Sequence, residues 1–472
     1  MRYWPIIVGT FLVAGCAHYQ PQPVSPEQTA AQWESRRLDD PGLKKFLEQN
    51  AGHEIQSWPR KNWDLNSLTL AAFYFHPSLE VARAQWLVAV AGEKTAGARP
   101  NPTLSFDPSY DSQIPGNYSP WLVPLTFDLP IETAGKRGKR IAEAEKVSES
   151  ARWSFISAAW HIRSDVRSSL LDFKIAGQRA ALLEQQFAAQ KQIVKLLQQR
   201  FDAGEISQPE LVVAQVALNK TQMDLGDAES ARVAAHSQLA ASLGVSEAAL
   251  AGGNFQFDFS IRGIGELTST KARQVALRSR ADILGSLADY AAAEDDLRLE
   301  IAKQYPDLHL GPGYAWNNGN AGDNQWQLGA TLELPILDQN QGPVAEATAR
   351  RKLAAAKFIE LQSQVIGEID GALAGLRAAR EQLKNGNELV AAERQQEKST
   401  RAQLAAGAAE PLDVLSSQLE TDNALLTQLD NEAKLQAAVG TLEDALQLPT
   451  DSLAAAIVKI SDEDPGGKDA HP

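Results

Sequence analysis

The sequence has almost no cysteine and no pair of histidines spaced for a metal site. Its 472 residues include a single cysteine, Cys16, so the chain can form neither an internal disulfide nor a cysteine-based zinc site. None of its seven histidines lies three or four residues from another, which excludes a helical two-histidine metal site. Walker loops, G-x-S-x-G elbows and H-E-x-x-H motifs are also absent. We therefore predict no enzyme activity, no metal site and no cofactor.

Two further shortages argue against nucleic-acid binding and against helical membrane spans. Acidic residues outnumber basic ones by 59 to 45, for a formal net charge of −14, whereas phosphate binding needs clustered lysine and arginine. Beyond the amino terminus, no stretch has 18 uncharged apolar residues. We therefore expect no nucleic-acid partner and no transmembrane helix.

The amino terminus is typical of an export signal. A short apolar run follows Arg2 and ends at Cys16, which predicts a signal peptide over residues 1–15. The sequence VAGC resembles a bacterial lipobox without a following aspartate, as in outer membrane lipoproteins, and it makes Cys16 the candidate lipid-attachment residue. The alternative is a plain signal peptide with an incidental cysteine.

Both ends of the mature chain are predicted to lie outside the core. Residues 16–63 contain five prolines and are expected to form a lipidated, extended N-terminal arm. Residues 451–472 are expected to be a disordered C-terminal tail.

The chain between these ends repeats itself. Residues 125–131 (LTFDLPI) resemble 330–336 (ATLELPI) at an offset of 205 residues, and the Ala-Gly turns at Gly204 and Gly407 recur at an offset of 203. Matches at nearly one spacing predict a duplicated fold. The predicted repeats are 64–250, with a β-hairpin at about 102–131, and 251–450, with a β-hairpin at about 305–336.

Each repeat predicts a helical stretch, a β-hairpin, a very long helix, a tight turn and a shorter return helix. The long helices, about 141–202 and 343–405, would each extend roughly 93 Å, which is too long for a globular core. The return helices are about half that length. We expect each to be completed end to end by the opening helix of the other repeat: 209–243 by 267–303, and 412–446 by 65–98.

The predicted strands alternate apolar and polar residues, and each has about the ten residues that cross a membrane when tilted. Phe127 and Leu129 share one face, whereas Asp128 lies on the other with His309, Gln327 and Glu333. A half-buried soluble sheet alternates in the same way. Tryptophan and tyrosine near the strand ends, as in an aromatic girdle, favour the membrane interpretation.

Four strands cannot close a barrel in lipid, because open edges would leave backbone groups unpaired. Four strands from each of three chains would close a twelve-stranded barrel with a water-filled lumen. The predicted fold class is thus a mixed α/β membrane protein: a long α-helical coiled-coil barrel plus four transmembrane β-strands per chain, in two tandem repeats, closed as a trimeric barrel.

Residues 99–104 (RPNPTL), 127–137 (FDLPIETAGKR), 332–337 (LELPIL) and the two Ala-Gly turns occur in a fixed order. In this arrangement the chain resembles the TolC-like outer membrane efflux family, particularly its lipoprotein members that serve heavy-metal and multidrug pumps. The resemblance implies a homotrimer in the outer membrane whose helical tunnel reaches into the periplasm. It also implies two partners: a periplasmic adaptor (membrane fusion) protein and an inner-membrane pump of the RND type.

The resemblance places the periplasmic mouth and adaptor contact at the two helical turns, Gly204, Glu205, Ile206 and Ser207 in the first and Gly407, Ala408 and Ala409 in the second. Glu210 and Asp413 follow the turns at matching positions. In three chains, six such carboxylates would form an aperture that favours cations. The alternative is that both residues favour the starts of their helices through the helix dipole.

Lys136, Arg137, Lys139 and Arg140 open the first long helix, where positive charge opposes the helix dipole. We predict that they contact phospholipid head groups at the inner face of the outer membrane, and the alternative is four solvated side chains.

The predicted function is a passive exit duct for small molecules or metal ions. Two other functions stay open: the outer membrane component of a type I protein secretion system, and a periplasmic coiled-coil structural or adaptor lipoprotein.

Overall fold

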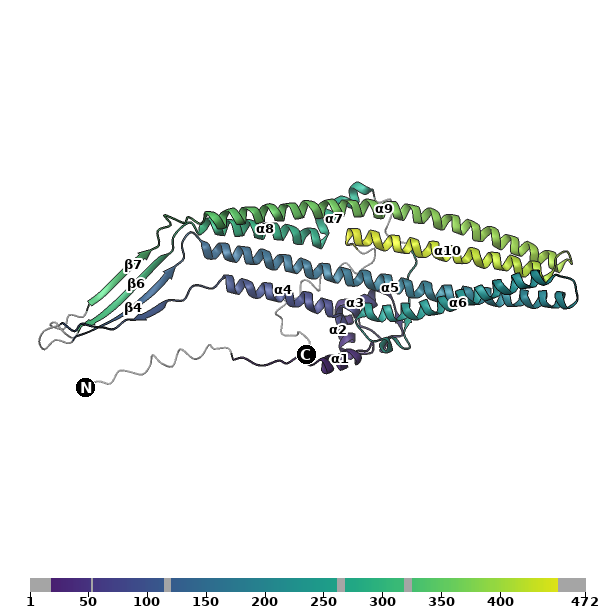
Figure 1. Cartoon of the computed structure of the whole chain (residues 1–472), viewed down its shortest axis with the longest axis horizontal. Helices are drawn as coiled ribbons and strands as arrows, with labels where there is room; N and C mark the ends of the chain where they lie inside the picture. Colours follow the sequence, from purple (N-terminus) through teal and green to yellow (C-terminus); the bar gives the residue numbers. More distant parts are fainter. Residues whose placement is uncertain (1–17, 52–53, 114–119, 261–267, 318–324, 449–472) are drawn as a thin grey trace.

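The computed structural model describes residues 18–51, 54–113, 120–260, 268–317 and 325–448. The molecule is elongated, with a β-sheet at one end, two helical hairpin tips at the other and long helices between them (Figure 1). The predicted signal peptide, Cys16 and the predicted tail at 451–472 lie outside the described residues, and so do most residues of the two predicted strand turns.

The described part of the predicted extended arm contains helices. Helix α1 (Pro26–Glu34) and helix α2 (Pro41–Ala51) both begin with proline, at the position where its missing N–H is tolerated and its fixed φ suits a helix. Leu43 and Leu47 of α2 are fully buried in the main hydrophobic cluster. Two of the five prolines that suggested an extended arm, Pro26 and Pro41, therefore start helices, and α2 belongs to the core.

Within the described residues, eight further α-helices form the body of the molecule. In the first repeat they are α3 (Leu65–Phe75), α4 (Pro77–Ala96), α5 (Lys136–Asp202) and α6 (Gln208–Leu243); in the second they are α7 (Ser269–Ser279), α8 (Ala281–Ala302), α9 (Gln341–Ala405) and α10 (Pro411–Leu446). Each predicted opening helix is broken in two, at His76 and at Arg280, where the backbone turns extended. The long helices and their return helices match the prediction closely.

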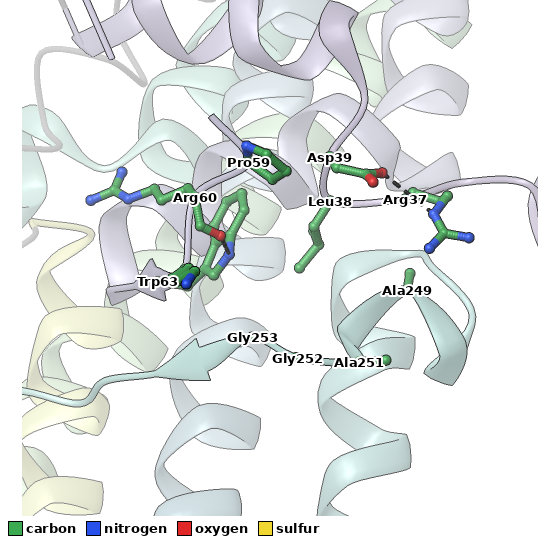
Figure 2. A pocket seen from close by; sticks show the side chains of 11 residues that line it. Arg37, Leu38, Asp39, Pro59, Arg60, Trp63, Ala249, Ala251, Gly252 and Gly253 are labelled. Atoms are coloured by element: carbon green, nitrogen blue, oxygen red, sulfur yellow. Dashed lines mark hydrogen bonds and ion pairs between the residues drawn. The ribbon is translucent and has the colours of Figure 1, made fainter. Parts of the chain in front are cut away.

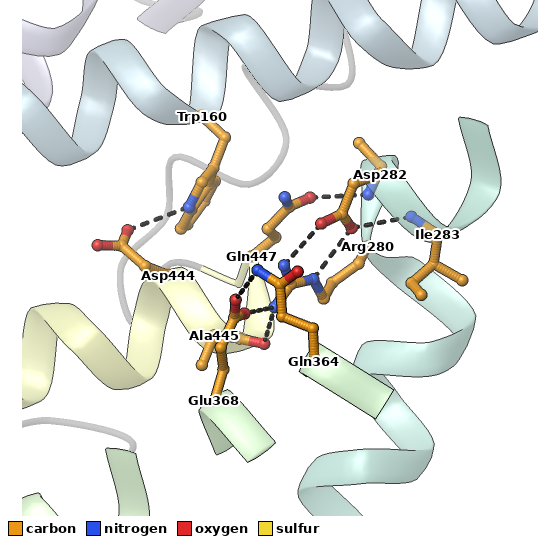
Figure 3. Close-up of polar contacts among 10 residues, drawn as sticks. Trp160, Arg280, Asp282, Ile283, Gln364, Glu368, Asp444, Ala445 and Gln447 are labelled. Atoms are coloured by element: carbon orange, nitrogen blue, oxygen red, sulfur yellow. Dashed lines mark hydrogen bonds and ion pairs between the residues drawn. The ribbon is translucent and has the colours of Figure 1, made fainter. Parts of the chain in front are cut away.

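The half-length helices are completed within their own repeat, so the predicted pairing between repeats is wrong. Helix α6 ends at the break between α3 and α4, where Arg36 donates hydrogen bonds to the carbonyls of Phe75 and Gly244 at 2.7 Å each. Helix α10 ends at the break between α7 and α8, where Arg280 donates to the carbonyl of Ala445 at 2.8 Å (Figure 3). The β-hairpin and the helical turn each return the chain directly beside the long helix, which explains this local pairing.

Gly244 shows how closely these helix ends meet. It ends α6 in the left-handed conformation, with φ of 72°. A Cβ at this position would lie 2.9 Å from the Cα of His76 and 3.1 Å from the carbonyl oxygen of Phe75. Glycine therefore satisfies both the backbone conformation and the close approach.

The helices form one layer of four rows (Figure 1). The first row consists of α4 and α6, and the second is α5. The third row consists of α8 and α10, and the fourth is α9. Apolar side chains are exposed on both outer edges of this layer. Val213 and Met223 on α6 are 69% and 71% exposed, and Ile359 on α9 is 62% exposed. Both edges thus carry apolar surface that the described part of the chain does not cover.

The predicted side belt crosses the layer at mid-length. It contains the 3-10 helix η1 (Glu247–Leu250) and the short strand β5 (Asn254–Phe255), which pairs in parallel with β1 (Asn62–Trp63). Phe255 and Trp63 are buried in the main cluster, so the belt joins the N-terminal segment to the helices.

The sheet has the strand order β2–β4–β6–β7, with β3 also paired to β4. The strands are β2 (Thr103–Phe106), β3 (Ser109–Tyr110), β4 (Trp121–Ile131), β6 (Leu308–Asn317) and β7 (Gln325–Leu332), all antiparallel to their neighbours. The first predicted strand is thus present as two pieces. Among the described residues, the outer edges of β2 and β7 pair with no other strand, and the sheet is open.

Candidate functional site

One face of the sheet is apolar and exposed. Leu104, Phe106, Phe127 and Leu328 all project from it, and Leu328 is 79% exposed. Two ring pairs, Tyr110–Trp121 and Tyr314–Trp326, lie at the end of the sheet remote from the helices, with centroids 5.1 and 4.8 Å apart. Exposed apolar area of this extent marks a surface that contacts lipid or another protein.

The opposite face of the sheet is polar. Asp128 on β4 and His309 on β6 lie on it and form a hydrogen bond, with Nδ1 of the imidazole 3.0 Å from a carboxylate oxygen. Beside this pair is a hollow of about 380 Å³ whose lining includes Thr126, Gln327 and Thr331. The sequence correctly assigned Asp128, His309 and Gln327 to one polar face, whereas Glu333 lies just beyond the end of β7.

The basic residues at the start of α5 find partners inside the chain. Lys136 is buried and donates to Oδ1 of Asp307 at 2.8 Å. Arg140 forms an ion pair with Glu132, which raises the pKa of the guanidinium through their hydrogen bond. Arg137 donates to the carbonyl of Gly97 at 2.7 Å, at the end of α4.

These contacts supply the compensation that the helix dipole requires, and a head-group contact of Lys136, Arg137 and Arg140 stays a prediction. The cluster joins the sheet to the helices through Asp307, next to β6, and through the last carbonyls of α4. For Lys139, which is only half-buried, the head-group contact stays a prediction.

Both predicted mouth turns are tight and exposed. Gly204 and Gly407 adopt the left-handed conformation, with φ of 76° and 73°. In each turn the third residue after the helix donates a backbone hydrogen bond back to the helix: Glu205 to Arg200 and Ala408 to Gln403, both at 2.8 Å. Ile206 and Ala409 are half-buried, and Ser207 is exposed. The two turns thus have the same construction, as the internal repeat implies.

Glu210 and Asp413 act as helix-capping residues in the described chain. The carboxylate of Glu210 accepts hydrogen bonds from the hydroxyl and backbone N–H of Ser207, at 2.6 and 3.3 Å, and these bonds lower its pKa. Asp413 accepts from the backbone N–H of Glu410 at 2.8 Å. Each completes a capping box at the start of its helix. Their role at an aperture stays a prediction.

An ion pair links the two hairpin tips. Arg200, near the end of α5, pairs with Glu410, which precedes α10, and the pairing raises the pKa of Arg200. Both side chains are exposed to solvent. The sequence did not predict this contact, because it joins residues 210 positions apart.

The seam between α5 and α10 is polar from mid-length to the tips. At mid-length, Arg163 and Arg167 both reach the buried carboxylate of Glu443, at 3.1 and 3.3 Å. Next to them, Trp160 donates to Asp444 at 3.1 Å (Figure 3), and burial raises the pKa of this carboxyl group. Toward the tips follow the pairs Arg179–Asp430, Gln186–Asn423 and Arg200–Glu410.

The interior of each helical hairpin is apolar by contrast. Ile369 and Leu373 of α9 pack in one cluster with Leu435 and Val439 of α10. In the other hairpin, α5 and α6 meet through a smaller cluster of Ala180, Leu183 and Ala228. Each hairpin is thus held by hydrophobic burial, whereas the contacts between the two hairpins are mostly polar, with Leu426 of α10 also packed against the Ala180–Leu183 cluster.

A cavity of about 250 Å³ lies where the N-terminal segment meets the belt (Figure 2). Its lining includes Arg37, Arg60 and Trp63 and the backbone of Gly252 and Gly253. Arg37 forms an ion pair with Asp39 at 3.4 Å. The arginine side chains lie at the rim, so the cavity has no converging set of catalytic groups.

A model of outer membrane efflux proteins matches the chain twice, over residues 74–245 and 272–446. The chain belongs to the outer membrane efflux protein family. The two matches correspond to the two halves recognised by internal repetition, and together they cover most of the helices and strands of this efflux protein.

Two curated relatives resemble this efflux protein at low identity. The cobalt-zinc-cadmium resistance protein CzcC of Cupriavidus metallidurans is 25% identical over 233 residues, which are 49% of this chain and 54% of that protein. The chain therefore aligns with only about half the length of CzcC. Nodulation protein T of Rhizobium leguminosarum bv. viciae is 23% identical over 439 residues, 86% of each chain.

The solved structure of CusC, described with its transmembrane channel formation, superposes on this efflux protein with a TM-score of 0.66. The match covers 84% of this chain and 95% of CusC at 18% identity. The fold is therefore that of the TolC-like channels. Across the described ranges of this efflux protein, no helix is both long enough and apolar enough to span a bilayer.

The seam residues were missed because their partners lie in the other repeat. Arg163 and Arg167 are four residues apart on one helix face, and no acidic residue lies three or four positions from either. Two arginines with no acidic residue at helical spacing on an alanine-rich helix would have indicated a partner on another helix. The sequence could not have identified that partner as Glu443.

Proposed function

We propose that this efflux protein is the outer membrane channel of a tripartite efflux system, a passive exit duct from the periplasm for small molecules or metal ions. The observation that carries this proposal is the open sheet, with an exposed apolar face, a polar face and two edges that pair with no other strand of the described residues. In lipid such edges must be paired, since every unsatisfied backbone group costs several kcal/mol.

A homotrimer satisfies this requirement. Each copy provides four strands, when β2 and β3 are counted as one strand beside β4, β6 and β7. Three copies would therefore close a twelve-stranded barrel, which has room for a water-filled lumen. The exposed edges α6 and α9 of the helical layer would meet between copies in the same way. The sheet would lie in the outer membrane, with Cys16 lipidated beside it and the helices in the periplasm.

The hairpin tips would receive substrate from an inner-membrane pump of the RND type through a periplasmic adaptor. Because α9 and α10 pack on each other by apolar contacts and on α5 by polar ones, this hairpin can move as a unit while its interior stays packed. If the adaptor binds the open position of this hairpin more tightly than the closed one, it would open the mouth without any chemical reaction.

Two adjacent residues on β7 test the membrane placement. Leu328 projects from the apolar face, whereas Gln327 lines the hollow on the polar face. Arginine on the lipid face costs about 2–4 kcal/mol at mid-bilayer, so Leu328→Arg should strongly reduce the amount of trimer in outer membrane fractions. Gln327→Arg, the matched control, should insert as well as the wild type.

The oligomer and the duct are tested on the purified full-length protein. Its mass in detergent should be that of three chains, and it should conduct ions in planar bilayers. A monomer that dissolves in detergent-free buffer once Cys16 is replaced, or equal insertion of both arginine variants, would refute the proposed function.

A further inference from the structure

A carboxylate fixes one ring nitrogen of a histidine on the polar face of the sheet. Nδ1 of His309 lies 3.1 and 3.0 Å from Oδ1 and Oδ2 of Asp128. A carboxylate can only accept hydrogen bonds, so in the neutral imidazole Nδ1 carries the proton and donates it. The lone pair is then on Nε2, which lies on the far side of the ring from Asp128. A carboxylate that orients a histidine in this way is a common feature of metal-binding imidazoles.

The surroundings of the imidazole leave room for a hydrated ion. His309 is the register partner of Thr331, which lines the hollow of about 380 Å³ together with Asp128. Gly311 and Gly329, also register partners, line the same hollow without contributing side chains. Asp128, the partner of the imidazole, thus lines an open space with hydroxyl and amide oxygens, and His309 adjoins this space through its register partner Thr331.

The site is accessible and incomplete as a metal cage. The side chains of His309 and Asp128 are 39% and 43% exposed. Among the residues that the structure describes, no cluster of three or more histidine, cysteine or acidic side chains is arranged to hold a metal. One imidazole with water and a few oxygens binds an ion weakly and releases it, as conduction requires.

We propose that the Asp128–His309 pair is a transient binding point for divalent transition-metal cations, such as Zn²⁺, on the wall of the conduit. The proposal rests on the proposed function, because the polar face surrounds a lumen only in the closed barrel. Imidazole nitrogen suits Zn²⁺, Co²⁺ and Ni²⁺, whereas Mg²⁺ prefers oxygen ligands. The pair would therefore favour transition-metal cations within the cargo of the duct.

The first test is the binding of Zn²⁺ to the full-length protein in detergent at pH 7.5, measured by isothermal titration. His309→Gln should lose the weak Zn²⁺-binding phase that the wild type shows. Asp128→Asn should keep the site but weaken it by about 10- to 100-fold, because it removes the orienting partner. His161→Gln, which removes an exposed histidine of α5, is the matched control and should leave this site intact. Circular dichroism and trimer mass should be unchanged in all three variants.

The second test is conductance in planar bilayers, with Zn²⁺ or Mg²⁺ added to a KCl solution. Zn²⁺ should lower the conductance of the wild type and of His161→Gln but not of His309→Gln, and Mg²⁺ should affect none of them. Equal Zn²⁺ binding by the wild type and His309→Gln would overturn the inference, while a conducting wild type would still support the duct. A wild type that conducts no ions would overturn the duct, and with it the role of the pair in a conduit.

Discussion

The ion pair between Arg200 and Glu410 makes the two hairpin tips of one chain a testable latch. If the mouth opens by separation of these tips, replacing Arg200 with alanine should favour the open state. Arg401→Ala is the matched control, because Arg401 is a nearby arginine that pairs with Glu397 on its own helix and does not join the tips. Arg200 is preferable to Glu410 as the mutated partner, because Glu410 also belongs to the capping box of α10.

The expected magnitude follows from the exposure of the pair. The side chains of Arg200 and Glu410 are 33% and 60% exposed, so one pair contributes only about 0.2–1 kcal/mol. Three pairs in a trimer that opens as a unit would contribute about 0.6–3 kcal/mol, or roughly a 3- to 140-fold change in the ratio of open to closed mouths. The change should shrink as salt rises from 0.1 to about 1 M, because exposed charges are screened.

The assay is single-channel recording of the purified trimer in planar bilayers without adaptor. Arg200→Ala should raise the open probability within this range, Arg401→Ala should not, and Arg200→Lys should keep most of the closed state because the charge remains. The latch is refuted if Arg200→Ala and Arg401→Ala behave alike at low salt.

Three further predictions concern buried charge. Glu443→Ala leaves two guanidinium groups buried without their carboxylate, so we expect a loss of about 3–5 kcal/mol, seen as a lower midpoint for thermal loss of helical circular dichroism; an unchanged midpoint would contradict this. Burial raises the pKa of Asp422 from 3.8 to about 6, so the fold favours the neutral carboxyl group. The protein is therefore most stable, as far as Asp422 is concerned, below about pH 4. Its free energy of unfolding should fall by up to about 3 kcal/mol as the pH rises through 6. Asp422→Asn should lose less stability than the wild type when thermal unfolding at pH 4 and pH 7 is compared, and equal losses would exclude Asp422 as the cause. Lys136→Gln breaks the buried pair with Asp307 and should lower trimer yield, whereas Lys139→Gln should not; the reverse result would restore the lipid head-group interpretation of this cluster.

At the two hairpin tips, the sequence predicted the local backbone features correctly but not the contact between the tips. Gly204 and Gly407 were located correctly, because a tight reversal between two helices needs a left-handed residue that glycine supplies. The alternative role of Glu210 as a helix-start residue was also correct, since capping is a local property of the chain. The contact between Arg200 and Glu410 was not predictable, because it depends on how two hairpins pack.

For the four basic residues at the start of α5, the sequence indicated the need for a partner but did not identify the partner inside the chain. The sequence indicated correctly that positive charge at the start of α5 needs compensation, but it assigned lipid head groups as the partners. Asp307 and Glu132 supply compensation from within the chain, and Asp307 lies 171 residues away from Lys136. The need for a negative partner can thus be recognised from the local sequence, whereas the identity of that partner depends on the tertiary structure.

The sequence by itself determined the duplication, the long helices, the two tight turns and the alternation of the strands, because each follows from spacing along the chain and from local backbone preference. Only the tertiary structure decided that α6 continues α4 and α10 continues α8, that α2 belongs to the core, and that a polar seam separates two apolar hairpins. The two repeats present nearly equivalent helix ends, so their local patterns do not distinguish pairing within a repeat from pairing between repeats. The choice depends on contacts such as Arg36 with Gly244 and Arg280 with Ala445, which exist only once the chain has folded.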